Sequence, residues 1–162
     1  MSPRAAWRLE QLGFTAYDYA GGKMDWLGYD LPGEGAAVLA GTAVDRDVPR
    51  MSMEAPLGDV RRALERYGLA VVVTSRQVVM GIVTPDGIDG ATAQFSAGDV
   101  MRFGVTTVRP SEDLEALVHR MHHAGADGVV VTRSDGVLVG YLHLDAALEH
   151  VSLHAEGGEA HP

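Results

Sequence analysis

Residues 113–145 read DLEALVHRMHHAGADGVVVTRSDGVLVGYLHLD, and this stretch decides the fold. Its first part predicts a helix, because apolar residues recur with the i, i+3, i+4, i+7 spacing of one buried face at Leu114, Leu117, Val118 and Met121. Gly125 is expected to end this helix, as glycine often does. Val129–Val131 and residues 137–144 predict two strands. The Asp135-Gly136 pair between them predicts a hairpin with a tight primed turn, whose two central residues need positive φ.

The same unit occurs earlier, at residues 56–84, which read PLGDVRRALERYGLAVVVTSRQVVMGIVT. The helix residues correspond in order, with Leu57, Val60, Leu64 and Gly68 in the places of Leu114, Leu117, Met121 and Gly125. Val71–Val73 are predicted to match Val129–Val131, and Gly81 to match Gly140. Since each unit is too small to bury its own apolar face, the duplication predicts two repeats that pack together.

Each copy resembles a cystathionine β-synthase (CBS) domain, and the two together resemble a CBS pair. The resemblance is carried by the lead-in Asp99-Val100-Met101, by Thr107-Val108, and by the strand ends at residues 81–84 and 140–143. It implies an α/β fold in which two βαββ(α) repeats form one pseudo-twofold module. CBS pairs often associate face to face, so the resemblance also implies a homodimer.

Residues 1–35 resemble the C-terminal end of a rhodanese domain, which implies a small helix–strand–helix cap. The matching residues fall in order: Gly13, Phe14, Gly21, Gly22, Lys23, Trp26, Leu31 and Pro32. Rhodaneses transfer sulfur through a cysteine thiolate, and this chain contains no cysteine. Sulfur transfer is therefore not expected. The segment is interpreted as a remnant that packs on the repeats, with ligand or partner binding as the alternative.

The remaining boundaries follow from composition. Residues 36–41 are predicted to be a linker, 42–90 the first repeat, 91–153 the second repeat and 154–162 a disordered tail. The first repeat is expected to lack a long helix after its last strand, because Pro85 and several glycines follow. The second should keep this helix to about residue 153, with an apolar stripe at Leu144, Leu148 and Val151.

Charge and composition restrict the function. The chain has 162 residues, 46% hydrophobic, and a net charge of −9, which argues against general affinity for nucleic acid or an anionic membrane. No signal peptide or membrane-spanning run is visible, so a cytoplasmic protein is expected. His119, His122 and His123 could present two imidazoles on one helix face, but no third ligand is fixed, and no metal site is expected.

CBS pairs commonly bind adenosine ligands between the two copies, so the resemblance implies AMP, ADP, ATP or S-adenosylmethionine as a ligand. The family pattern is Gly, two apolar residues, Thr or Ser, any two residues, then Asp. The carboxylate accepts hydrogen bonds from the ribose hydroxyls, and the hydroxyl residue meets phosphate. The candidate ligand-binding residues are therefore Thr84, Asp86, Thr106, Thr107, Val108, His143 and Asp145.

Both copies depart from this pattern, because Asp86 and Asp145 each come one position early and His143 replaces the hydroxyl residue. Each candidate therefore has a structural alternative. Asp86 is also a typical solvated turn residue, and Asp145 suits a helix N-terminus. Thr84 can bond to backbone, His143 can be a structural or interface residue, and residues 105–108 form a good strand in any case.

No catalytic motif is present in the sequence, so an enzyme is not expected. The leading hypothesis is a non-catalytic regulatory module that binds an adenosine nucleotide or adenosyl ligand between the repeats. The alternative is a dimeric protein-interaction module whose nucleotide site has decayed. A third hypothesis is an accessory of sulfur metabolism, recruited through residues 1–35.

Overall fold

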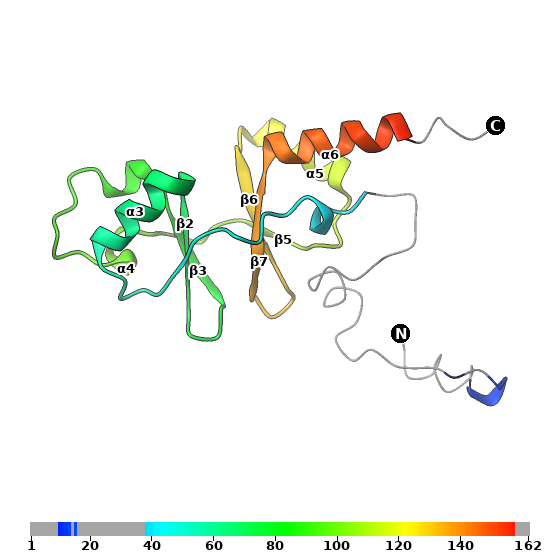
Figure 1. The fold of residues 1–162 in the computed structure, drawn as a ribbon, viewed down its shortest axis with the longest axis horizontal. Coiled ribbons are helices and arrows are strands. Elements are labelled where there is room, and N and C mark those ends of the chain that lie inside the picture. Colours follow the sequence, from blue (N-terminus) through cyan, green and yellow to red (C-terminus); the bar gives the residue numbers. More distant parts are fainter. Residues whose placement is uncertain (1–9, 14, 16–37, 158–162) are drawn as a thin grey trace.

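The computed structural model describes residues 10–13, 15 and 38–157 (Figure 1). A short 3-10 helix η1 (Ala40–Thr42) precedes two repeats. The first contains β1 (Arg50–Met51), α3 (Leu57–Tyr67), β2 (Ala70–Val73), β3 (Val79–Val83) and the 3-10 helix η2 (Pro85–Ile88). After α4 (Ala97–Val100) and β4 (Arg102–Phe103), the second contains β5 (Thr107–Val108), α5 (Leu114–Ala124), β6 (Gly128–Thr132), β7 (Leu138–His143) and α6 (Leu144–Gly157).

The repeats form two separate sheets. The first has the strand order β1-β2-β3-β4 and the second the order β5-β6-β7. In both, the short first strand runs parallel to the next, which then pairs antiparallel with the following strand. The two hairpins lie side by side at the centre, with α3 on one flank and α5 and α6 on the other (Figure 1). The predicted α/β fold of two βαββ(α) repeats is confirmed.

The predicted helix ends are confirmed. Gly68 and Gly125 both adopt the left-handed conformation, with φ of 77° and 62°, directly after α3 and α5. A residue with a Cβ atom resists this conformation, so glycine ends each helix at little cost. At the other end of α5, the Asp113 carboxylate accepts a hydrogen bond from the Ala116 N–H (2.9 Å), which satisfies one free donor of the first turn.

The predicted hairpin between β6 and β7 is confirmed, but the primed turn is wrong. Gly136 has a φ of 80°, whereas Asp135 does not have positive φ. The Gly136 N–H donates to the Arg133 carbonyl (3.0 Å), so a longer turn with one left-handed residue connects the strands. In the first repeat Gln77 takes the same role, with a φ of 64°. A register shift in each hairpin absorbs the additional residue.

The strand register corrects the alignment of the repeats. Gly81 and Gly140 correspond as predicted, since each pairs with the residue directly before the register shift of its hairpin, Val72 and Val131. Val72 therefore matches Val131, and the match of Val71–Val73 with Val129–Val131 is wrong by one residue. The reason is a longer loop in the second repeat. Leu69 alone separates Gly68 from β2, whereas Ala126 and Asp127 separate Gly125 from β6.

Each repeat is completed by the segment that precedes the other. Ala40 and Ala43 precede the first repeat but are buried in the core of the second. Ala97 and Met101 precede the second repeat but are buried in the core of the first. We call these exchanged segments, residues 38–45 and 95–103, the first and second lead-in. The exchange joins the two repeats into one unit.

The lead-ins cross the sheets at the two matched glycines. A Cβ atom on Gly81 would lie 2.5 Å from the Arg102 carbonyl oxygen, and one on Gly140 would lie 2.2 Å from that of Asp45. These distances leave no room for a side chain. Arg102 pairs with Ile82, and Asp45 forms an antiparallel bridge with Tyr141. The two crossings are therefore equivalent positions of the duplicated fold.

The repeats also share a hydrophobic cluster, formed by Val48, Leu69, Val71, Val73, Ile82, Val130, Leu138 and Tyr141. At the hairpin ends, the Val79 N–H donates to the Gly136 carbonyl (3.1 Å) and the Leu138 N–H to the Gln77 carbonyl (2.9 Å). Apolar burial and backbone pairing thus both hold the two sheets together.

The segments around the repeats differ in part from expectation. Only the short helix η2 follows β3, as predicted from Pro85. Helix α6 continues to Gly157, beyond the expected end at residue 153 and into the predicted tail. Most of the rhodanese-like residues 1–35 lie outside the described residues. In the parts that the structure describes, no helix is long and apolar enough to cross a membrane.

The glycine crossings make a testable prediction. We expect Gly81→Ala and Gly140→Ala each to lower the free energy of unfolding by about 1–3 kcal/mol, because the new methyl group meets backbone oxygen. Urea denaturation measures this loss. Gly58→Ala in α3 is the matched control, since its Cβ meets nothing within 4 Å and helical alanine is favourable. Equal stability of all three variants would contradict the crossing.

Candidate functional site

A cleft of about 690 Å³ opens between the end of β3 in the first repeat and β5, β6 and α5 of the second. Its apolar surface comes mainly from the second repeat. The lining residues are Ile82, Thr84, Asp86, Arg102, Val105, Thr106, Thr107, Val108, Glu112, Leu117, Arg120, Met121, Ala124, Gly125, Ala126, Asp127, Gly128, Val129, Val130 and Tyr141. The volume suits a small organic ligand.

The cleft brings together five of the seven residues that the sequence singled out. Thr84 and Asp86 approach from the end of β3, and residues 106–108 approach along β5. His143 and Asp145 do not line it. His143 ends β7 and packs edge-on against Tyr141, with ring centroids 4.8 Å apart. Asp145 is exposed in the first turn of α6, where a carboxylate stabilises the positive end of the helix.

Thr84 and Asp86 interact with each other at the edge of the cleft. A hydrogen bond from the Thr84 hydroxyl is the main cause that holds the pKa of Asp86 below its usual value, and the Arg102 charge lowers this pKa further. Asp86 is thus an exposed, ionised carboxylate that can accept hydrogen bonds from a ligand. Although Asp86 comes one residue early, on η2, it still lines the cleft with Thr84.

Tyr141 forms part of the cleft wall. Its side chain is buried and its ring covers Gly128, where a Cβ would lie 2.3 Å from the ring. Burial raises the pKa of Tyr141, and the nearby Asp127 charge raises it further, while Arg102 lowers it. The phenol therefore keeps its proton at neutral pH and can donate a hydrogen bond.

The sequence did not single out the cationic groups of the cleft. Arg120 forms an ion pair with Glu112, whose carboxylate also accepts from the Arg109 N–H (3.0 Å). Arg102 lies on the second lead-in and forms no ion pair with any residue in the described ranges. The sequence does show that Arg102 directly follows the lead-in residues Asp99-Val100-Met101. It does not show that Arg102 pairs with β3, because this pairing depends on the exchange of lead-ins.

This arrangement is suited to binding a small polar ligand. Hydroxyl and phosphate groups can be recognised by the Asp86 carboxylate, three threonine hydroxyls, the Tyr141 phenol and the Arg102 guanidinium, and the valines can cover a flat ring. Among the described residues, no group of three or more His, Asp or Glu side chains could hold a metal ion.

Comparison with known proteins agrees with this geometry. Residues 97–153 match the family model of the CBS domain. No curated protein matches the chain. Among solved structures, the CBS domains of a transcriptional regulator from Streptococcus pneumoniae are 20% identical, with a TM-score of 0.58, and the match covers 70% of this chain and 92% of that one.

Two other similar structures contain nucleotides. The cytosolic domain of the Mg2+ channel MgtE in complex with ATP is 20% identical, with a TM-score of 0.62, and the match covers 69% of this chain but only 48% of that one. CBSX2 in complex with AMP is 16% identical, with a TM-score of 0.63, and the match covers 73% of this chain and 98% of that one. The described part of this chain therefore has the fold of a tandem CBS pair.

The contact between Thr84 and Asp86 can be tested by titration. We expect the Asp86 carboxyl carbon, followed by NMR, to show a pKa below the ordinary value of an aspartate. Thr84→Val removes the donated hydrogen bond and should raise the pKa towards its ordinary value, whereas Thr84→Ser should keep it low. An Asp86 pKa that Thr84→Val leaves unchanged would show that the two side chains do not interact.

Proposed function

We propose that this chain is a non-catalytic regulatory module that binds an adenosine nucleotide or adenosyl ligand in the cleft between its repeats. The observation that carries the proposal is the convergence of Thr84 and Asp86 from one repeat with Thr106 and Thr107 from the other on a single cavity. Hydroxyl and carboxylate groups of this kind recognise a ribose and a phosphate. The ATP and AMP complexes of two proteins with the same fold support this class of ligand.

The position of the cleft supports a regulatory role. Its walls belong to both repeats, so a ligand that contacts both binds one relative placement of the repeats more tightly than others. A ligand shifts a conformational equilibrium only through such a difference in affinity. The signal would pass to a further protein or domain through the outer helices, which cover the flanks of the module (Figure 1).

The ligand can be tested by thermal unfolding and calorimetry with AMP, ADP, ATP and S-adenosylmethionine. A ligand at a hundred times its dissociation constant should stabilise the chain by about 2.7 kcal/mol. Asp86→Ala should abolish or strongly reduce this gain. Asp145→Ala is the matched control and should retain it, because Asp145 lies outside the cleft. No stabilisation by any of the four compounds at millimolar concentration would refute the proposal.

A second candidate is a dimeric protein-interaction module. It is favoured by the outer surface of α6, where Leu148 and Leu153 are 44% and 59% exposed. Leu148 belongs to the predicted apolar stripe of α6, so this stripe is only partly covered by the rest of the chain. An apolar helix face of this kind can pack against a second copy.

Sedimentation at increasing concentration tests this candidate. We expect a dimer for the unmodified chain and a monomer for Leu148→Asp, because a buried, unpaired carboxylate opposes association. Phe103→Asp is the control, since Phe103 is an exposed apolar residue on the other repeat. A monomer at all concentrations, or a dimer that Leu148→Asp leaves intact, would exclude α6 as the contact.

A further inference from the structure

The duplicated fold defines a second position equivalent to the cleft. Arg102 crosses β3 at Gly81, and Asp45 crosses β7 at the matching Gly140, so Arg102 and Asp45 occupy equivalent positions. The short strands that follow, β5 and β1, pair in the same register with Val130 and Val71. Thr107 therefore corresponds to Arg50.

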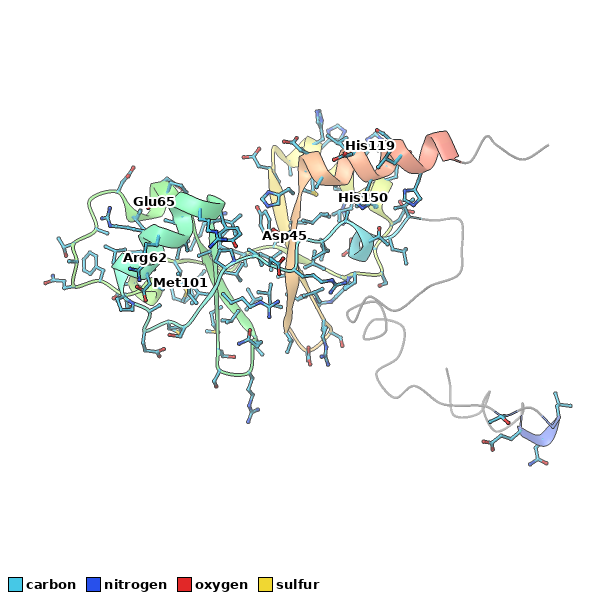
Figure 2. The ribbon with its side chains drawn as sticks, in the orientation of Figure 1. Asp45, Arg62, Glu65, Met101, His119 and His150 are labelled. Carbon is cyan, nitrogen blue, oxygen red and sulfur yellow. The ribbon has the colours of Figure 1, made fainter. Side chains whose placement is uncertain are left out.

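The chemistry of the cleft is not repeated at the second position. Asp45 stands where the cleft has Arg102, and its carboxylate accepts a hydrogen bond from the Asp47 N–H (2.8 Å). Pro49, which offers no N–H donor, stands where the cleft has Thr106. Arg50 donates to the Arg46 carbonyl (3.2 Å). Figure 2 shows Asp45 between the first repeat and the second.

The matched residues Arg102 and Asp45 therefore carry opposite charges. In the cleft, Arg120 is already paired with Glu112. Arg102 lines the cleft together with Asp86 and Tyr141. A guanidinium binds phosphate oxygens well, whereas the Asp45 carboxylate repels them.

A hollow beside α3 in the described first repeat does not restore the second position. It is lined by Pro49, Arg62, Ala63, Glu65, Arg66 and Tyr67. Neither His143 nor Asp145 contributes to it. Arg62 and Glu65 lie on α3, at the flank of the first repeat (Figure 2).

We propose that the chain binds one phosphorylated nucleoside, in the cleft alone, and that Arg102 is its phosphate partner. This inference rests on the proposed function of the cleft. It adds that the chain has one ligand site, and that Arg102 recognises the phosphate, the group that a nucleotide has and a nucleoside lacks. The duplication thus provides two equivalent positions, and only the cleft has an arginine at the crossing.

Calorimetry with AMP and adenosine tests the inference on the full chain. We expect one AMP per chain, bound more tightly than adenosine. Arg102→Gln should weaken AMP about tenfold, as expected for loss of a charged hydrogen bond, and change adenosine little. Arg62→Gln is the matched control, since Arg62 is an exposed arginine outside the cleft, and should leave both affinities unchanged.

The possible results separate this inference from the proposed function. Binding of two AMP molecules per chain would overturn the inference, and so would an Arg102→Gln variant that loses AMP and adenosine affinity equally. Both results would leave the cleft as an adenosyl site. Failure of the unmodified chain to bind either compound would overturn the proposed function and the inference with it.

Discussion

The structure depends on the close approach of backbone to backbone at Gly81 and Gly140. At each glycine, the lead-in of one repeat lies against a strand of the other, at a distance that excludes a Cβ atom. The crossing delivers Ala97 and Met101 to one core, and Ala40 and Ala43 to the other. Neither core is complete within its own repeat, so each repeat depends on the other for part of its apolar packing.

The sequence was sufficient for features that local chemistry determines. Helix ends at Gly68 and Gly125, the hairpins and the absence of a long helix after Pro85 all follow from the preferences of single residues. Apolar periodicity identified the two repeats. The residues of the candidate cleft came from the family resemblance, and five of them converge on one cavity.

Features that depend on contacts distant in the sequence were missed. The extra loop residues before β6 shift the alignment of the valine strands, which consist of similar residues and so contain no marker of register. The sequence analysis also did not predict the exchange of lead-ins, although the same Ala-Gly dipeptide occurs in both, as Ala40-Gly41 and Ala97-Gly98. Both alanines donate backbone hydrogen bonds of 2.8 Å, to the carbonyls of Glu112 and Ala55. The role of Arg102 depends on this exchange.

The exchange of lead-ins also constrains how the chain folds. The first lead-in reaches its place only when β7, near the other end of the described chain, has formed, so it contributes contacts of long sequence separation. Such contacts carry a large loop-closure entropy and slow the folding reaction. During synthesis, the first repeat leaves the ribosome before β7 exists. Its own lead-in then has no surface to cover, and the two repeats must complete their folding together.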